Sequence, residues 1–340
     1  MLSFLAPGSS TKVELNESML GGGQVAGLLR FQNNDLAEGR NLLGRMAIAI
    51  SESMKTQNRL GLTLNGQPGE NLFAPISLGN ATPSNFNTST ATMALTVADP
   101  TALQASSYTV SFTAGDAGSV TRHSDGKVFN FDGSALPPVT VASVFSAQGL
   151  GVTLSGAVNA GDQFVINSLQ GAAAELQALQ YSPTDLAAAN PVNAAMGATN
   201  GGSLQLASLK ATGPITQPAT GSPVTIAFTA GSPATYSATV PGPPLATIAT
   251  GNYVSGEKIA INGWEIALQG APKSGDTVTV GNATDSQYGD WYKRDTGNAS
   301  ALMALRDVPM FDNATLADGF ASAMAQVGTR TQSAQFAAEM

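Results

Sequence analysis

Few side chains in this sequence could make or break bonds, and their scarcity limits the chemistry to consider. His123 is the only histidine among 340 residues, and cysteine is absent. A Ser–His–Asp arrangement would have to use His123, whereas thiolate nucleophiles, disulfides and multi-ligand His/Cys metal sites are excluded. The segment Thr121–Gly126 around it has the composition of a hairpin turn. We therefore expect His123 to be an exposed turn residue without a catalytic role.

The glycine-rich and acidic segments give no stronger indication of catalysis. Gly21–Ala26 fits the Gly-x-Gly-x-x-Ala pattern of dinucleotide sites, but no clear strand precedes it and no α/β alternation follows. A carboxylate pair for glycoside cleavage could come from five acids whose spacing shows no pairing: Glu257, Glu265, Asp276, Asp285 and Asp290. We predict that the chain is not an enzyme and needs no cofactor or metal.

The two tryptophans bear on an alternative function. Trp264 and Trp291 could form a platform for sugar rings, as in a secreted adhesin or carbohydrate-binding β-module. Trp264 alternates with Ile266 and Leu268, so in a strand all three would face the same side. This pattern favours a core or inter-domain position for Trp264. An exposed aromatic platform would favour the carbohydrate-binding alternative.

The overall composition excludes some partners. Charged residues make up 11% of the chain, against about 25% in typical soluble domains. The net charge is −8, and the 15 lysines and arginines form no cluster. We therefore expect neither nucleic acid nor an anionic membrane surface as a partner. No apolar run of about 18 residues is present, so membrane insertion is not expected.

Both ends of the chain have helical patterns. Apolar residues recur at helical spacing over 25–60, and Gly61 would provide a stop. Thr315–Asp318 resembles a capping box, and an alternating spacing of four and three follows it to the last residue. We therefore expect the helix to continue beyond Met340 in the natural chain. Six apolar residues are expected to form a packing and assembly seam, although a surface helix on a globular core is the alternative: Leu36, Leu43, Ile50, Leu316, Phe320 and Val327.

The middle of the chain changes to short alternating runs separated by Gly, Pro, Asn and Asp, which is typical of antiparallel β-structure. The expected strands are 108–112, 127–131, 139–144, 163–166, 224–228, 258–261 and 277–280. Between these strands, 171–179 and 184–190 are alanine-rich and are predicted to be short helices.

An internal repeat divides this β-rich region. The segment 149–166, with a turn at Gly161-Asp162, recurs as 263–280, with a turn at Gly275-Asp276. Upstream, Phe-Thr-Ala-Gly at 112–115 recurs at 228–231. Two unrelated hairpins could share this turn chemistry, but two matches in the same order favour duplication.

These patterns predict an α+β multidomain fold. We expect a discontinuous helical bundle domain from residues 1–85 with 287–340. Two antiparallel β-rich domains, 91–190 and 191–286, would be inserted between its halves. Each helical end is too small to bury its apolar stripe alone, which is why the two ends are assigned to one domain.

Several segments resemble the flagellar hook-associated protein 1 family. The resemblance is carried by 22–36, 41–47 and 57–73 near the start, 183–191 in the middle, and 297–306 and 320–332 near the end. It implies a structural, extracellular component that joins hook to filament by axial self-assembly and leaves the cell through the flagellar type III pathway. The implied partners are copies of the chain, the hook protein and the second junction protein. An export chaperone would act through a C-terminal segment, and the family's terminal coiled-coil segments are missing here.

Overall fold

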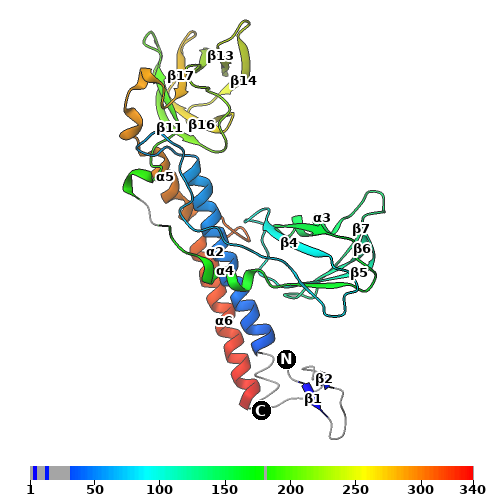
Figure 1. Cartoon of the computed structure of the whole chain (residues 1–340). Coiled ribbons are helices and arrows are strands. Elements are labelled where there is room, and N and C mark those ends of the chain that lie inside the picture. The colour runs from blue at the N-terminus through cyan, green and yellow to red at the C-terminus, as the bar shows by residue number, and fades with distance from the viewer. Residues whose placement is uncertain (1–2, 6–11, 15–30, 180–181, 340) are drawn as a thin grey trace. The chain divides into compact units, whose positions relative to one another are not determined.

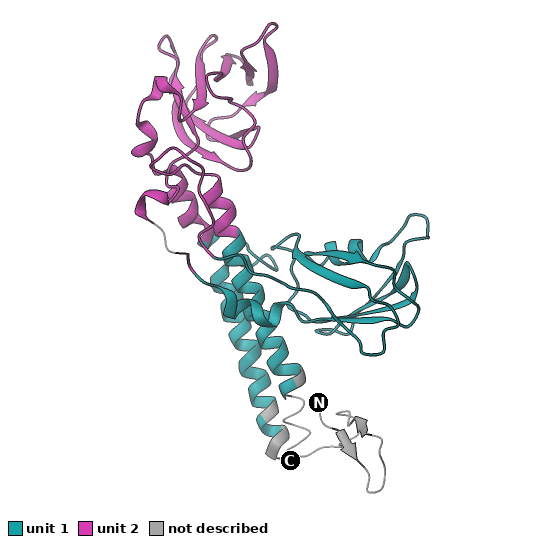
Figure 2. Ribbon diagram, in the orientation of Figure 1, with its two compact units in different colours: residues 1–52, 74–177, 306–340 teal, residues 53–73, 178–305 magenta. Residues whose placement is uncertain are grey.

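A computed structural model describes residues 3–5, 12–14, 31–179 and 182–339. The chain forms two compact units, coloured separately in Figure 2. Unit 1 comprises Met1–Glu52, Ala74–Gln177 and Arg306–Met340, and unit 2 comprises Ser53–Phe73 and Ala178–Leu305. The division into one helical and two β-rich domains stays a prediction. The glycine-rich segment 21–26 lies outside the described residues.

Unit 1 contains one long helix, α6 (Leu316–Glu339), and most of a second, α2 (Leu36–Arg59), whose residues from Ser53 onward belong to unit 2. A short π-helix, η2 (Phe31–Asp35), leads into α2, and α6 lies beside α2 (Figure 1). Thr315 caps α6, because its Oγ1 accepts the Asp318 N–H at 3.3 Å and donates to the Asp318 carboxylate at 2.8 Å. No helix in the described part of the chain combines the length and apolarity needed to cross a membrane.

The β-rich part of unit 1 contains two sheets. Strands β3 (Thr82–Pro83), β9 (Gln163–Ile166), β5 (Tyr108–Ala114), β6 (Ala117–Arg122) and β7 (Val128–Asp132) form a five-stranded sheet in that order, and β4 (Thr92–Val97) pairs with β8 (Leu150–Ser155). Helices α3 (Val141–Ser146) and α4 (Leu169–Glu175) complete it. The core contains Met93, Tyr108 and Phe164 and extends to Ile48 of α2. This part of the chain therefore packs on α2. A separate pair of short strands, β1 (Ser3–Leu5) and β2 (Lys12–Glu14), is antiparallel.

Unit 2 has a five-stranded and a three-stranded sheet. The first has the order β10 (Val192–Met196), β17 (Thr277–Asn282), β12 (Val224–Thr229), β13 (Ala234–Val240) and β14 (Ala246–Tyr253); the second has β11 (Gln205–Ala211), β16 (Trp264–Gln269) and β15 (Lys258–Ile261). Short helices flank them: η3 (Pro183–Asp185), η4 (Ser286–Tyr288), η5 (Trp291–Lys293), α5 (Gly297–Ala304) and η6 (Leu305–Asp307), which reaches into unit 1. Trp264 is fully buried in the core, and its indole N–H donates to the Gln217 carbonyl at 2.6 Å.

The sequence repeat corresponds to a structural repeat. The two five-stranded sheets have the same strand order, with β9 and β5 of one matching β17 and β12 of the other. Asp162 accepts the backbone N–H groups of Thr88 and Asn159 at 2.8 and 2.9 Å. Asp276 likewise accepts those of Gly201 and Lys273, at 2.7 and 2.8 Å. The shared Gly-Asp turn thus makes similar hydrogen bonds in both segments, and the two segments share one strand order, as the duplication hypothesis predicts.

Two local predictions were wrong, and a third was right in position but not in mechanism. Residues 139–144 were expected to be a strand but lead into α3, because Thr140 Oγ1 accepts the Ser143 N–H and caps a helix there. Residues 184–190 form only the end of η3 and an irregular segment. Helix α2 ends at Arg59, next to the predicted stop, although Gly61 does not have the positive φ of a C′ glycine. A Cβ at Gly61 would lie 2.1 Å from Asn298 Nδ2, so close packing, not helix termination, requires the glycine.

Candidate assembly surface

The predicted seam is only partly brought together. Leu36, Leu43 and Val327 line a groove of about 170 Å³ between α2 and α6, which we call the α2–α6 groove. Its other lining residues are Phe31, Asp35, Gly39, Arg40, Arg330 and Thr331. Ile50, Leu316 and Phe320 do not line it. Ile50 and Leu316 are half-buried, and Phe320 is exposed.

Two glycines of the helix pair differ in the space around them. A Cβ built on Gly39 would lie 3.5 Å from Val327 Cγ2, which is an ordinary packing distance. A Cβ at Gly319 would lie 2.1 Å from the ring of Phe311, so α6 could not accept a side chain there without displacing that ring. Glycine has a low helix propensity, but the missing side chain at Gly319 leaves room for the ring of Phe311.

Arg330 joins the two helices electrostatically. Its guanidinium contacts Asp35 Oδ1 at 3.0 Å and Glu38 Oε2 at 2.5 Å. In the sequence, Arg330 is a polar residue that interrupts the apolar spacing from Leu316 to Ala337. Two acids spaced three residues apart, Asp35 and Glu38, were the signal that could have identified its partner face.

Arg45 makes a second polar connection within unit 1. Its Nη1 lies 2.7 Å from Asp312 Oδ2, and its guanidinium stacks 4.6 Å from the centroid of Phe311. The same Nη1 donates to the Leu103 carbonyl at 3.4 Å. Arg45 therefore joins α2 to the segment before α6 and to the β-rich part of unit 1, and sequence spacing gave no indication of this role.

One side of α6 remains apolar and exposed. Phe320, Met324 and Val327 are 49%, 51% and 37% exposed and fall on one face at helical spacing. Ala323, on the adjacent face, is buried. Leu43 of α2 is 46% exposed as well. Contiguous exposed apolar side chains mark interaction surfaces more often than isolated ones do.

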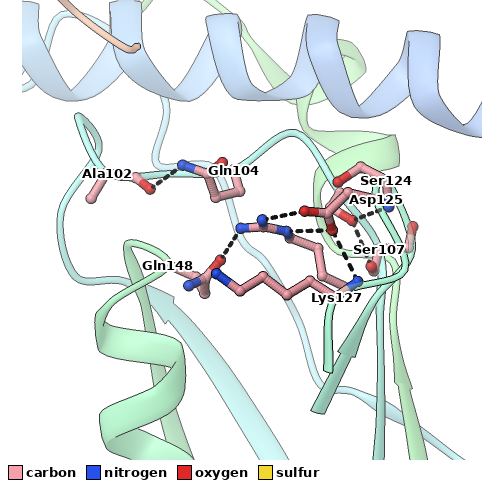
Figure 3. Close-up of polar contacts among 9 residues, drawn as sticks. Ala102, Gln104, Ser107, Ser124, Asp125, Lys127 and Gln148 are labelled. Carbon is pink, nitrogen blue, oxygen red and sulfur yellow. Dashed lines mark hydrogen bonds and ion pairs between the residues drawn. The ribbon is translucent and has the colours of Figure 1, made fainter. Parts of the chain in front are cut away.

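The residues considered for chemistry have structural partners. His123 lies in the β6–β7 turn as predicted, and its Nε2 is 2.8 Å from Thr109 Oγ1. Partial burial lowers the pKa of His123. Beside it, Arg122 bonds both carboxylate oxygens of Asp125, at 2.9 and 2.6 Å, and Gln148 at 2.7 Å (Figure 3). The Arg122 hydrogen bond holds the pKa of Asp125 at about 2.

The five acids weighed for glycoside cleavage are dispersed. Glu265 is held by Lys210 and Lys258 at 3.1 and 3.0 Å, and Asp290 by Lys293 at 3.0 Å. Asp276 and Asp285 accept backbone N–H groups, and Glu257 is exposed. Among the described residues, no group of three or more His, Asp or Glu side chains is arranged to hold a metal. The geometry supports packing and assembly in preference to catalysis.

Two family models match consecutive parts of the chain. Residues 2–73 match the helical domain of flagellar hook-associated protein FlgK, and residues 82–168 match the D2-like domain of flagellar hook-associated protein 1. Neither match includes most of unit 2.

Curated relatives and a solved structure agree with these models. The chain is 29% identical to flagellar hook-associated protein 1 of Escherichia coli over 190 residues, which are 55% of this chain and 33% of that protein. It is 29% identical to the Salmonella typhimurium protein over 181 residues, 52% of this chain and 31% of that protein. The match thus spans about a third of each relative. The structure of the flagellar hook junction protein FlgK from Burkholderia pseudomallei matches 98% of this chain and 63% of its own, with 26% identity and a TM-score of 0.76.

Proposed function

Because this chain belongs to the flagellar hook-associated protein 1 family, we propose that it is a structural subunit of the bacterial hook–filament junction and not an enzyme. The observation that carries the proposal is the α2–α6 helix pair with its exposed apolar face. An isolated subunit would gain nothing from exposing Phe320, Met324 and Leu43, whereas a subunit in an assembly could bury them.

The partners and location follow from this role. The proposed partners are copies of the chain, the hook protein and the second junction protein, with an export chaperone before assembly. The site of action is extracellular, on the flagellum, after type III export. The sparse charge of the sequence, 11% of residues, is compatible with close packing of subunits.

The predicted domains would have different roles in the assembly. In the proposed arrangement, residues 1–85 with 287–340 form the axial, helical part that contacts neighbouring subunits. The β-rich domains 91–190 and 191–286 are inserted between its halves. The seam residues Leu36, Leu43 and Val327, together with Phe320, would lie at the contact between subunits.

A complementation experiment tests the proposal. The full-length gene carrying Phe320→Ser and Met324→Ser is expressed in a strain that lacks its own copy. Both side chains are about half exposed, so the secreted protein should remain folded. We expect short or absent filaments, release of filament subunits into the medium and loss of swimming. The matched control is Phe86→Ser, which changes an aromatic side chain that is 92% exposed on the β-rich part.

Normal filaments and swimming with the double variant, once its secretion and folding are confirmed, would contradict the proposed surface. If Phe86→Ser reduced filament length and swimming as much as the double variant, the proposed contact between subunits would not lie at Phe320 and Met324.

A further inference from the structure

Unit 2 contains a groove with no assigned role. It has a volume of about 360 Å³ and lies along strands β10 and β11, and we call it the β10–β11 groove. Among the strands of the described residues, β10 pairs only with β17 and β11 only with β16, so each has an edge without a neighbouring strand. Val192 and Leu209 contribute apolar lining, and Trp291 and Asp295 line it from the segment after β17.

In the first repeat, the equivalent strand edges are joined by backbone hydrogen bonds. Its residues 79–81 and 93–95 correspond to 192–194 and 206–209, judged by their pairing with equivalent strands. In the first repeat the Ala81 N–H donates to the Met93 carbonyl at 2.8 Å, and the Leu95 N–H donates to that of Gly79 at 3.1 Å. In the second repeat, the pairing of β11 with β16 shifts register between Leu206 and Ser208. β10 and β11 are not paired with each other, and the groove lies along them.

The groove contains one buried hydrogen-bond acceptor without a donor, beside a carboxylate. Asn190 is 7% exposed; its Nδ2 donates to the Leu209 carbonyl at 2.9 Å, while its Oδ1 is buried without a partner. Asp295 Oδ2 accepts the Asn190 N–H at 2.6 Å and is the only carboxylate among the lining residues. A buried acceptor without a partner costs free energy that a ligand carrying N–H donors would recover.

The rim of the groove adds aromatic faces. Trp291 is 53% exposed, and Tyr292 lines the same groove. Indole and phenol rings attract flat cations, arginine above all. The nearest lysine in sequence, Lys293, is already paired with Asp290 at 3.0 Å and is not part of the lining. Acceptors, a carboxylate and aromatic faces together complement a guanidinium group.

We propose that the β10–β11 groove binds an extended peptide segment of a partner protein through one arginine side chain. The unpaired strand edges supply backbone hydrogen bonds for an extended segment. Asp295 and Asn190 Oδ1 supply acceptors for the guanidinium, and Trp291 stacks on it. This site lies outside both matched family segments and does not depend on the axial role proposed above.

Tryptophan fluorescence provides the test, because Trp291 is exposed at the groove and the only other tryptophan, Trp264, is fully buried. The whole chain is titrated with the peptide acetyl-Val-Thr-Arg-Thr-Val-amide, with its citrulline analogue and with free arginine amide. We expect saturable quenching by the arginine peptide and at least tenfold weaker binding of the neutral citrulline peptide, because a charge-assisted hydrogen bond is lost. Free arginine amide should also bind more weakly, since it lacks the extended backbone.

Two variants assign the effect to the groove. Asp295→Asn should weaken the arginine peptide about tenfold while leaving the citrulline peptide unchanged. Trp291→Ala, at an exposed position that tolerates truncation, should weaken the arginine peptide, as measured by calorimetry. Absence of saturable binding, equal binding of the arginine and citrulline peptides, or undiminished binding by both variants would overturn the proposal. Free arginine amide binding as tightly as the peptide would overturn its peptide part.

Discussion

At the scale of single residues, the ionisable side chains discussed above act mainly by fixing turns and elements through hydrogen bonds and ion pairs. The carboxylate of Asp162 is bonded by Ser89 and by backbone N–H groups, and these bonds lower its pKa to about 2. The backbone N–H of Lys273 is the largest cause of the lowered pKa of Asp276. Both acids are almost completely buried. In each repeat, a carboxylate therefore fixes the turn before a central strand.

Acid should selectively loosen these turns. The pKa of Asp276 is lowered by folding, so its stabilising contribution is present above the unfolded value of about 3.9 and is lost as the pH falls below it. Fluorescence of buried Trp264 reports on unit 2 directly. We expect Asp276→Asn to unfold unit 2 at lower denaturant concentration at pH 7, and to show a smaller further loss than the unchanged protein when the pH is lowered toward 2.

The control for this prediction is Glu257→Gln, which alters an exposed acid of the same unit. It should keep the original pH dependence. If Asp276→Asn is as stable as the unchanged protein at pH 7, the carboxylate does not fix the turn.

At the scale of elements, α2 organises unit 1 through close contact on two sides. On one side a Cβ at Gly44 would lie 1.8 Å from the Leu169 carbonyl oxygen at the start of α4. Nearby, Asn41 Nδ2 and Gln170 Nε2 both donate to Ser107 Oγ, at 3.2 and 3.1 Å. On the other side, Arg330 and Val327 of α6 contact α2. Helix α2 thus packs against the β-rich part of unit 1 on one side and against α6 on the other.

Two glycine substitutions should have opposite effects. Gly44→Ala forces displacement of backbone and should destabilise unit 1 by about 1–3 kcal/mol. Gly171→Ala lies in α4 with nothing within 4 Å of the new Cβ and should stabilise it by about 0.5–1 kcal/mol. Denaturant unfolding followed by circular dichroism measures both. A neutral Gly44→Ala would show that α2 and α4 do not pack this closely.

The Arg330 bridge can be measured by a double-mutant cycle with Asp35. Arg330→Met keeps the aliphatic stem and removes the charge. We expect a coupling free energy of about 1 kcal/mol between Arg330→Met and Asp35→Asn, because Arg330 is only partly exposed and Asp35 is largely buried. Arg306→Met should show no measurable coupling with Asp307→Asn, since both of those side chains are well exposed. No coupling for Arg330 would mean that the bridge does not join the helices.

Much of the fold followed from periodicity, and the exceptions have physical causes. Alternation placed β5, β9, β12 and β17 correctly because each has a buried face and an exposed face. It failed at 139–144, where a single Thr140 cap selects a helix. The α2–α6 groove was harder to predict. Periodicity identified its residues Leu36, Leu43 and Val327. It could not show that Phe320 is exposed or that Arg330 forms ion pairs with Asp35 and Glu38. Those features depend on contacts between residues nearly 300 positions apart in the chain.

At the scale of the whole molecule, two copies of one β-architecture accompany a helix pair assembled from distant parts of the chain. The first β-copy closes its strand edges, and the second leaves a groove between them. The two β-copies therefore share a strand order but differ at this edge, where the second has a groove. The helix pair, in contrast, matches the family's helical domain in its first half. We therefore propose assembly as the role of the helices and peptide binding as the role of the second β-copy.

Site-specific cross-linking in intact flagella tests the central claim most directly. Because the chain has no cysteine, a photoactivatable cross-linker can be attached to one introduced cysteine, as Phe320→Cys, with Phe86→Cys as the matched control. The account predicts that purified hook–filament structures contain the protein, and that position 320 cross-links to a second copy or to a neighbouring axial protein far more efficiently than position 86. Absence of the protein from these structures, or cross-linking at 86 without cross-linking at 320, would contradict it.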